Sequence, residues 1–169
     1  MKEAKDTVKA AKRKTLPRGS KETTTEKGHA FEKKVATWAR RKFNLDDVKQ
    51  NQFFKGKVVA RPYQVDIVGL KKVAGVLEAR IEVFWIECKA RKETVKRTDI
   101  AKFHGAAIDV KKMVPAITWS GLSEEQVKMR WDHLIFVSTS PFDGDAIKVA
   151  KQHKIACYYY DGKTFQEQK

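Results

Sequence analysis

The strongest constraint on this chain is the segment 81–89, in which β-branched and aromatic side chains predominate. Such residues favour a pleated strand, and successive side chains of a strand point to opposite faces. Ile86 and Cys88 should therefore share one face, while Glu87 and Lys89 share the other. The pattern predicts an apolar strand that ends with a carboxylate and an ammonium side by side.

A second apolar segment, residues 64–70, is interrupted by Asp66, and Gln64 shares the face of Asp66. We expect this segment to pair with residues 81–89 as an antiparallel hairpin connected by residues 71–80. Two carboxylates, one from each strand, can then lie across from each other on one face. Because close carboxylates repel and are costly to bury, the arrangement predicts a cation between them.

Oxygen-only ligation favours Mg²⁺, with Mn²⁺ as a substitute. Asp66 and Glu87 would bind the metal, and the backbone carbonyl of Cys88 could add a third oxygen. Lys89 would orient the attacking water and neutralise charge on a scissile phosphate. Glu32, in the predicted first helix, could be a further ligand or an anchor behind the ligands. Each residue also has a plainer interpretation. Glu87 and Lys89 could be an ordinary exposed ion pair, Asp66 could be an edge-strand carboxylate that faces solvent, and Glu32 could lie on a solvated helix face.

The charge of the chain points to a polyanionic partner. Its 36 Lys and Arg residues against 21 Asp and Glu residues give a formal net charge of +15, which predicts nucleic acid, most simply DNA. The predicted strand is followed by a basic cluster that consists of Arg91, Lys92, Lys96 and Arg97. We interpret this cluster as a phosphate-contact loop; the alternative is a solvated loop. Residues 1–27 are predicted to be a flexible basic tail, which either follows a phosphate backbone or only solubilises the chain.

The remaining pattern predicts one α/β domain, residues 28–169, with a central mixed sheet flanked by helices. Helices are expected at residues 28–43, at 98–113 with Thr98 as N-cap, and after Asp143 or Asp145 over residues 146–150. Strands are expected at residues 58–62, 64–70, 81–89, 134–138 and, as the last one, 155–160. Residues 44–51 are expected to be a loop, 116–131 are ambiguous, and Asp161-Gly162 predicts a hairpin turn.

Other site classes find no support in the sequence. Cys88 and Cys157 stand alone in apolar runs, which indicates buried thiols in a reducing compartment. The four histidines show no metal-ligand spacing and are interpreted as structural or surface residues, His104 having the best chance of meeting a substrate. No apolar stretch is long enough to span a membrane.

The motifs at residues 28–32, 64–69 and 86–89 together resemble those of the PD-(D/E)xK nucleases, the restriction-endonuclease-like superfamily. The resemblance is greatest to the catalytic domain of Mrr-type restriction enzymes, and next to archaeal Holliday-junction resolvases. It continues through residues 95–103, the strand at 134–138 and the alanine-containing helix, and so covers residues 28–162.

The resemblance implies a restriction-endonuclease-like core in which Asp66 and Glu87 bind the metal, Lys89 is the catalytic lysine and Glu32 is the acidic residue of the first helix. Gln64 and Val65 precede Asp66, so the proline of the motif name is absent. Mrr enzymes also carry a separate DNA-binding domain, for which the first 27 residues are too short. That difference argues against methylation-directed restriction.

We therefore expect a Mg²⁺-dependent endodeoxyribonuclease that acts on DNA in the cytoplasm without a small-molecule cofactor. Gln64 and the basic cluster would contact the nucleic acid. A homodimer is expected by analogy, because cutting two strands takes two such sites. The alternatives are a non-catalytic DNA-binding module of the same fold, a Holliday-junction nuclease and an RNA-processing nuclease.

Overall fold

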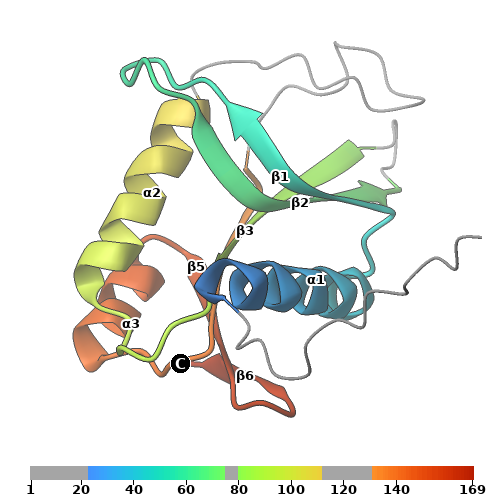
Figure 1. The fold of residues 1–169 in the computed structure, drawn as a ribbon. Coiled ribbons are helices and arrows are strands. Elements are labelled where there is room, and N and C mark those ends of the chain that lie inside the picture. The colour runs from blue at the N-terminus through green and yellow to red at the C-terminus, as the bar shows by residue number, and fades with distance from the viewer. Residues whose placement is uncertain (1–22, 75–79, 112–130) are drawn as a thin grey trace, which may run out of the picture.

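The computed structural model describes residues 23–74, 80–111 and 131–169 (Figure 1). In chain order the elements are α1 (Thr24–Phe43), β1 (Asp47–Phe54), β2 (Tyr63–Val73), β3 (Arg80–Lys89), α2 (Arg97–Lys111), β4 (His133–Ser138), α3 (Gly144–Gln152), β5 (Ile155–Tyr160) and β6 (Phe165–Gln168). The six strands form one sheet in the order β1 to β6. The β3–β4 and β4–β5 pairs are parallel and the other pairs are antiparallel, so the sheet is mixed.

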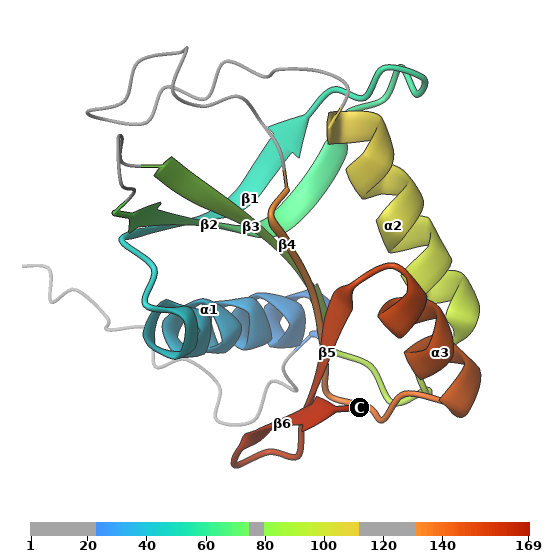
Figure 2. The same ribbon diagram turned by 180° about the vertical axis from the view of Figure 1, so that it is seen from behind.

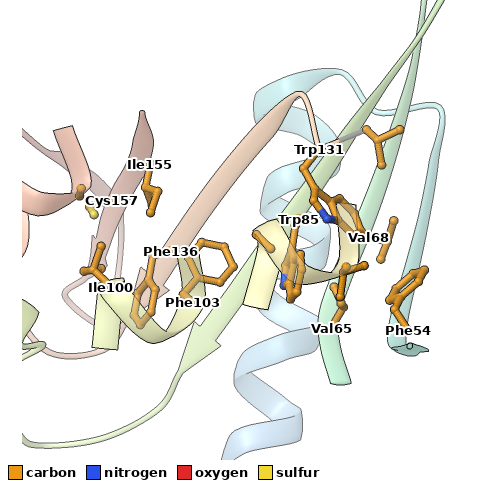
Figure 3. Packing of buried hydrophobic residues seen from close by; sticks show 14 of the residues in the cluster. Phe54, Val65, Val68, Trp85, Ile100, Phe103, Trp131, Phe136, Ile155 and Cys157 are labelled. Carbon is orange, nitrogen blue, oxygen red and sulfur yellow. The ribbon is translucent and has the colours of Figure 1, made fainter. Parts of the chain in front are cut away.

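Helices cover both faces of this sheet (Figures 1 and 2). Phe31, Val35 and Ala39 of α1 belong to one apolar cluster. The other cluster contains residues of α2 and α3 and is centred on Trp85, whose ring packs edge-on against Phe103 with the centroids 5.5 Å apart (Figure 3). The predicted architecture, an α/β domain with a central mixed sheet flanked by helices, is confirmed.

Helix α1 begins at Thr24, four residues before the expected start at Gly28. Thr23 is its N-cap: the Thr23 hydroxyl accepts from the backbone N–H of Glu26, and the Glu26 carboxylate accepts from the backbone N–H of Thr23. This reciprocal capping box satisfies N–H groups that would otherwise lack partners at the helix start. The expected start was wrong because the polar residues before Gly28 were assigned to the tail.

Strand β1 corrects the prediction of a loop at residues 44–51. Its sequence is polar and its residues are mostly half-buried, yet it pairs along its length with β2. Because β1 is an edge strand, backbone hydrogen bonds to β2 hold it without an apolar pattern of its own. Asn51 within it adopts a positive φ of 53°, a conformation that asparagine tolerates better than most residues.

The strand expected at residues 58–62 is absent; this segment is irregular. The Asp109 carboxylate of α2, 7% exposed, accepts hydrogen bonds from the backbone N–H groups of Val58 and Val59 at 2.8 and 3.2 Å. It also accepts from the Tyr63 hydroxyl at 3.0 Å. These backbone N–H groups therefore donate to a side chain and not to a neighbouring strand, so the segment does not extend the sheet.

The second half of the chain follows the sequence pattern closely. Helix α2 begins at Arg97, so Thr98 lies inside its first turn and is not the N-cap. The Asp99 carboxylate accepts from the backbone N–H of Lys96 at 2.8 Å instead. Asp143 caps α3 as expected, its side chain accepting from Ala146 N–H.

A hairpin closes the described chain. The expected turn at Asp161-Gly162 is present, and the Asp161 carboxylate accepts from the backbone N–H groups of Lys163 and Thr164. It leads into β6, so the prediction that residues 155–160 are the last strand was wrong. The short, polar sequence of β6 carries no apolar alternation by which it could have been recognised.

Both cysteines, Cys88 and Cys157, are buried free thiols, as expected. Of the ambiguous segment 116–131, all but Trp131 lies outside the described residues; Trp131 is buried against Trp85, with ring centroids 4.8 Å apart. Within the described parts of the chain, no helix has both the length and the apolar character that a membrane crossing requires.

Candidate active site

Asp66 and Glu87 come together through the pairing of β2 with β3. The predicted antiparallel pairing is confirmed, with Ile67 opposite Ile86, and one step further along each strand brings Asp66 level with Glu87. Residues opposite each other in an antiparallel pair share a face of the sheet. The Asp66 carboxylate also accepts a hydrogen bond from the backbone N–H of Cys88 at 2.8 Å. It is thereby fixed beside the chain between Glu87 and Lys89.

Lys89 and Glu87 form an ion pair, in which the Lys89 ammonium donates to Glu87 Oε1. The Glu87 side chain is 16% exposed and that of Lys89 is 40% exposed. Burial alone would lower the pKa of Lys89, but the Glu87 carboxylate, with a smaller contribution from Asp66, raises the pKa above its ordinary value. Lys89 is therefore a fixed cation at neutral pH.

The pKa of Asp66 is raised to about 7, first by burial and then by the negative charge of Glu87. The Cys88 N–H and the Lys89 ammonium oppose this rise, and Glu32 adds to it. Burial removes the water that would stabilise the Asp66 carboxylate, and Glu87 adds negative charge beside it, so the N–H donor and the neighbouring cation do not fully compensate. The position therefore favours an additional positive charge.

Glu32 reaches this region from α1. Its side chain, 14% exposed, contacts His29 Nδ1 at 3.3 Å and accepts from Asn51 Nδ2 at 3.4 Å. Asn51 in turn accepts from Gln64 Nε2 at 2.8 Å. A polar chain thus runs from α1 across β1 to β2 and ties Glu32 to the strand that carries Asp66. Sequence reasoning missed Asn51, because the edge strand on which it lies has no apolar signature.

A cavity of about 300 Å³ opens beside the motif on β3. Its lining residues are Tyr63, Gln64, Trp85, Glu87, Lys89, Asp99, Lys102, Phe103, Ala106 and Phe136. Polar groups of β2, β3 and α2 therefore converge on an apolar floor, as is typical of binding pockets. Lys102 adds a second cation that the sequence analysis did not single out. Lys102 directly precedes Phe103, which is buried on the core face of α2. That neighbouring position was the sequence signal by which Lys102 could have been placed near the cavity.

The predicted phosphate-contact cluster divides into two pairs of residues. Arg91 donates to both carboxylate oxygens of Asp99, and Lys96 lies 3.4 Å from Asp143 Oδ2. Lys92 and Arg97 are exposed. A second cavity, of about 650 Å³, is lined by Arg91 and Lys92 but not by Lys96 or Arg97. Arg91 therefore both faces this cavity and is held by Asp99.

The remaining predicted residues have simple surroundings. The Cys88 thiol packs in the apolar cluster of α1, and burial raises its pKa well above the usual range, so only its backbone could face a ligand. His104 stacks on His153 with ring centroids 3.8 Å apart and is not among the lining residues of the 300 Å³ cavity. Within the described residues, no group of three or more His, Cys, Asp or Glu side chains could hold a metal by itself.

Comparison with known proteins gives a structural likeness only. No family model and no curated protein matches the chain. The structure of AF1548, a protein of unknown function, superposes with a TM-score of 0.52 at 16% identity over 75% of this chain and 56% of its own. At this identity the likeness shows a shared fold.

Two further structures are similar to this chain at lower scores. They are the MspJI restriction endonuclease in complex with a 27-mer oligonucleotide (TM-score 0.45, 14% identity, 76% of this chain and 25% of that one) and the DNA modification-dependent restriction endonuclease AspBHI (TM-score 0.38, 15% identity, 87% and 37%). The chain thus spans between 25% and 56% of the length of the three proteins.

Proposed function

We propose that this protein is a metal-dependent endonuclease of the PD-(D/E)xK type that hydrolyses phosphodiester bonds in DNA. The observation that carries the proposal is the Asp66 carboxylate, anchored on Cys88 N–H between Glu87 and Lys89. Two carboxylates and an ammonium from paired strands thereby meet at one place, and Glu87 and Lys89 line a cavity there. The motif at residues 28–32, which contains Glu32, supports the same assignment.

Asp66 and Glu87 are the residues that would hold Mg²⁺ or Mn²⁺. The donor set fits such an ion, because Mg²⁺ is usually bound by one or two carboxylates, with water and substrate phosphate oxygens completing the shell. The raised pKa of Asp66 is a second observation in favour, since a cation would relieve the repulsion from Glu87. When bound, the ion would polarise a phosphate oxygen and lower the pKa of a coordinated water.

Lys89 supplies the charge that a phosphoryl reaction needs. It is held by Glu87 at the wall of the cavity, where its ammonium can orient an attacking water and neutralise negative charge that develops on the phosphate. Lys102 lines the same cavity from α2 and can bind a neighbouring phosphate. Both cations belong to regular elements, so their positions are set before a substrate arrives.

Glu32 would act through the polar chain that it forms with Asn51 and Gln64. This chain connects α1 to β2 close to Asp66 and would keep the strand aligned with β3. We assign Glu32 the role of an anchor or further ligand, and Gln64 that of a polar contact at the entrance of the cavity. Arg91 and Lys92, just beyond β3, and Lys96 and Arg97, where α2 begins, would contact phosphates.

The test is a cleavage assay with blunt duplex DNA, branched DNA, single-stranded DNA and RNA, with Mg²⁺, Mn²⁺ or EDTA. The proposal predicts metal-dependent cleavage of DNA by the wild type and none by Asp66→Asn. Lys148→Ala, on the exposed surface of α3, is the matched control and should cleave like the wild type. Binding of DNA without cleavage under every condition would instead identify a non-catalytic DNA-binding module. Cleavage confined to RNA or to branched DNA would assign the same chemistry to another substrate.

A further inference from the structure

A groove runs between α1 and the β5–β6 hairpin, which lie side by side in both ribbon views (Figures 1 and 2). It has a volume of about 840 Å³ and is lined by Lys33, Lys34, Thr37, Trp38, Arg41, Lys42, Tyr160, Lys163, Thr164 and Phe165. The lining thus consists of five cations, three aromatic rings and two threonines, with no carboxylate among them. The proposed catalytic residues do not use this groove.

No carboxylate of residues 23–74, 80–111 or 131–169 forms an ion pair with the cations of the groove. Lys33, Arg41, Lys42 and Lys163 are exposed. Lys34 donates to the Tyr160 hydroxyl at 3.0 Å. Positive charges gathered in this way repel one another, and a polyanion would offset the repulsion.

The floor of the groove is aromatic. Trp38 and Phe165 stack with ring centroids 4.4 Å apart, and Phe165 lies 4.5 Å from Tyr160. All three rings are only partly buried, so each keeps some surface exposed to the groove. A charged groove with aromatic rings at its base is typical of proteins that bind single-stranded nucleic acid, in which unpaired bases contact the rings. A blunt duplex does not expose base faces in this way.

The groove adjoins the 650 Å³ cavity, which reaches the part of the chain directly after β3. The 650 Å³ cavity shares Lys34 and Tyr160 with it and extends to Ala90 and Arg91, directly after Lys89. Lys27, Lys34 and Arg41 follow one another at intervals of seven residues on α1, which places them on one face about 10 Å apart. A line of cations therefore leads from the end of β3 along the whole helix.

We infer that this line of cations and rings binds an unpaired nucleic-acid strand that leads away from the catalytic cavity, so that the substrate is DNA with a single-stranded extension. The inference takes the identity of the strand from the proposed function. The segment before α1 is unsuitable as an occupant, because residues 1–22 contain eight Lys and Arg residues against three acidic ones. The phosphates would contact Lys33, Arg41 and Lys163, and the bases would lie on the rings.

The binding experiment uses the full chain in EDTA, so that no strand is cut. Fluorescence anisotropy compares a blunt duplex with the same duplex carrying an oligo-dT extension, over a series of salt concentrations. Arg41→Ala/Lys163→Ala removes two cations of the groove, and Lys148→Ala/Lys151→Ala removes two exposed cations of α3 as the matched control. Each phosphate contact to a single strand contributes about 0.7 to the log–log salt slope.

For the extended duplex, the groove variant should lower the slope by about 1.4 and weaken binding about tenfold near physiological salt. The control variant should bind like the wild type, and the blunt duplex should distinguish neither variant. Equal losses for blunt and extended duplexes, or equal losses in the two variants, would overturn the inference. Polyglutamate competing as well as oligo-dT would also overturn it, because the groove would then accept any polyanion.

Tryptophan fluorescence gives a second readout that charge alone would not change. Oligo-dT should quench the wild type, and Trp38→Phe should remove most of the quenching while keeping an aromatic ring in place. Unchanged quenching in this variant would show that bases do not reach the floor. Failure of the proposed nuclease function can be distinguished from failure of the groove inference. Binding that depends on the groove, without cleavage, would contradict only the nuclease function. Normal cleavage, with binding that does not depend on the groove, would contradict only the groove inference.

Discussion

Replacing Asp66 with asparagine should stabilise the metal-free protein while destroying its activity. Asparagine keeps an oxygen that can accept from Cys88 N–H but carries no charge opposite Glu87. A pKa raised from 3.8 to about 7 lowers the free energy of unfolding by roughly 4 kcal/mol once the group is fully ionised in both the folded and the unfolded state. Allowing for relaxation around the buried charge, we expect Asp66→Asn to raise the free energy of unfolding by about 1–3 kcal/mol at pH 8.

The sign follows from proton binding. Between the ordinary pKa and about 7, the folded state holds a proton on Asp66 that the unfolded state has lost. Stability contributed by this group therefore falls as the pH rises from about 4 to about 8. The advantage of Asp66→Asn should accordingly be larger at pH 8 than at pH 5, measured by urea unfolding in EDTA. Added Mg²⁺ should stabilise the wild type and leave the variant unchanged.

Asp161→Asn provides a control of opposite sign. The pKa of Asp161 is lowered by N–H groups of Thr164 and Lys163, so its carboxylate stabilises the fold above the ordinary pKa, and this stabilisation is lost as the pH falls. That variant should be less stable than the wild type at pH 8, and the difference should shrink in acid. If the gain of Asp66→Asn were the same at pH 5 and pH 8, the buried-carboxylate argument would be refuted.

Three further predictions concern Lys89, the N-cap of α1 and the residues before it. Lys89→Ala should reduce cleavage about 10²–10³-fold while leaving DNA affinity nearly unchanged, which paired binding and cleavage assays on one DNA would show; parallel losses would contradict the assigned role. Thr23→Ala removes the capping box of α1 and should cost about 1 kcal/mol of stability, seen as a lower thermal midpoint; an unchanged midpoint would mean that α1 does not depend on its cap. Deletion of residues 1–22, which spares Thr23, should lower the salt slope for duplex DNA by about 0.9 for each lost phosphate contact; an unchanged slope would mean that the tail does not contact DNA.

The sequence predicted the centre of the molecule well because alternation and hydrophobicity there agree. Strand β3 is apolar on both faces from Val83 to Ile86, directly before Glu87, and β2 is apolar on either side of Asp66, so both strands and their pairing could be inferred. The hydrogen bond from Cys88 N–H to Asp66 could not, since it depends on the register of the two strands. Register is decided by packing on both faces at once.

The parts that were missed share a physical cause. Strand β1 is polar over most of its length and lies at the edge. Pairing with β2 and the buried Phe54 at its end stabilise it, and no local pattern reveals that pairing. Asn51, which links Glu32 to Gln64, was missed for the same reason. Lys102 reaches the cavity only because α2 packs across β3, a tertiary contact between segments that the sequence analysis treated separately.

The local charge balance extends the argument for a metal at the proposed site. The chain as a whole is strongly basic, at +15, yet Asp66 experiences repulsion from both Glu87 and Glu32, with Lys89 as the opposing cation. A phosphate that approached Asp66 and Glu87 closely would be repelled by their carboxylates, although Lys89 and Lys102 line the same cavity. On the proposed function, a metal ion between these carboxylates and the phosphate would offset the repulsion, which Lys89, already paired with Glu87, does not offset alone. If the proposed function holds, the basic surface would bind phosphates broadly, and hydrolysis would be confined to the place where a metal ion is bound beside Asp66 and Glu87.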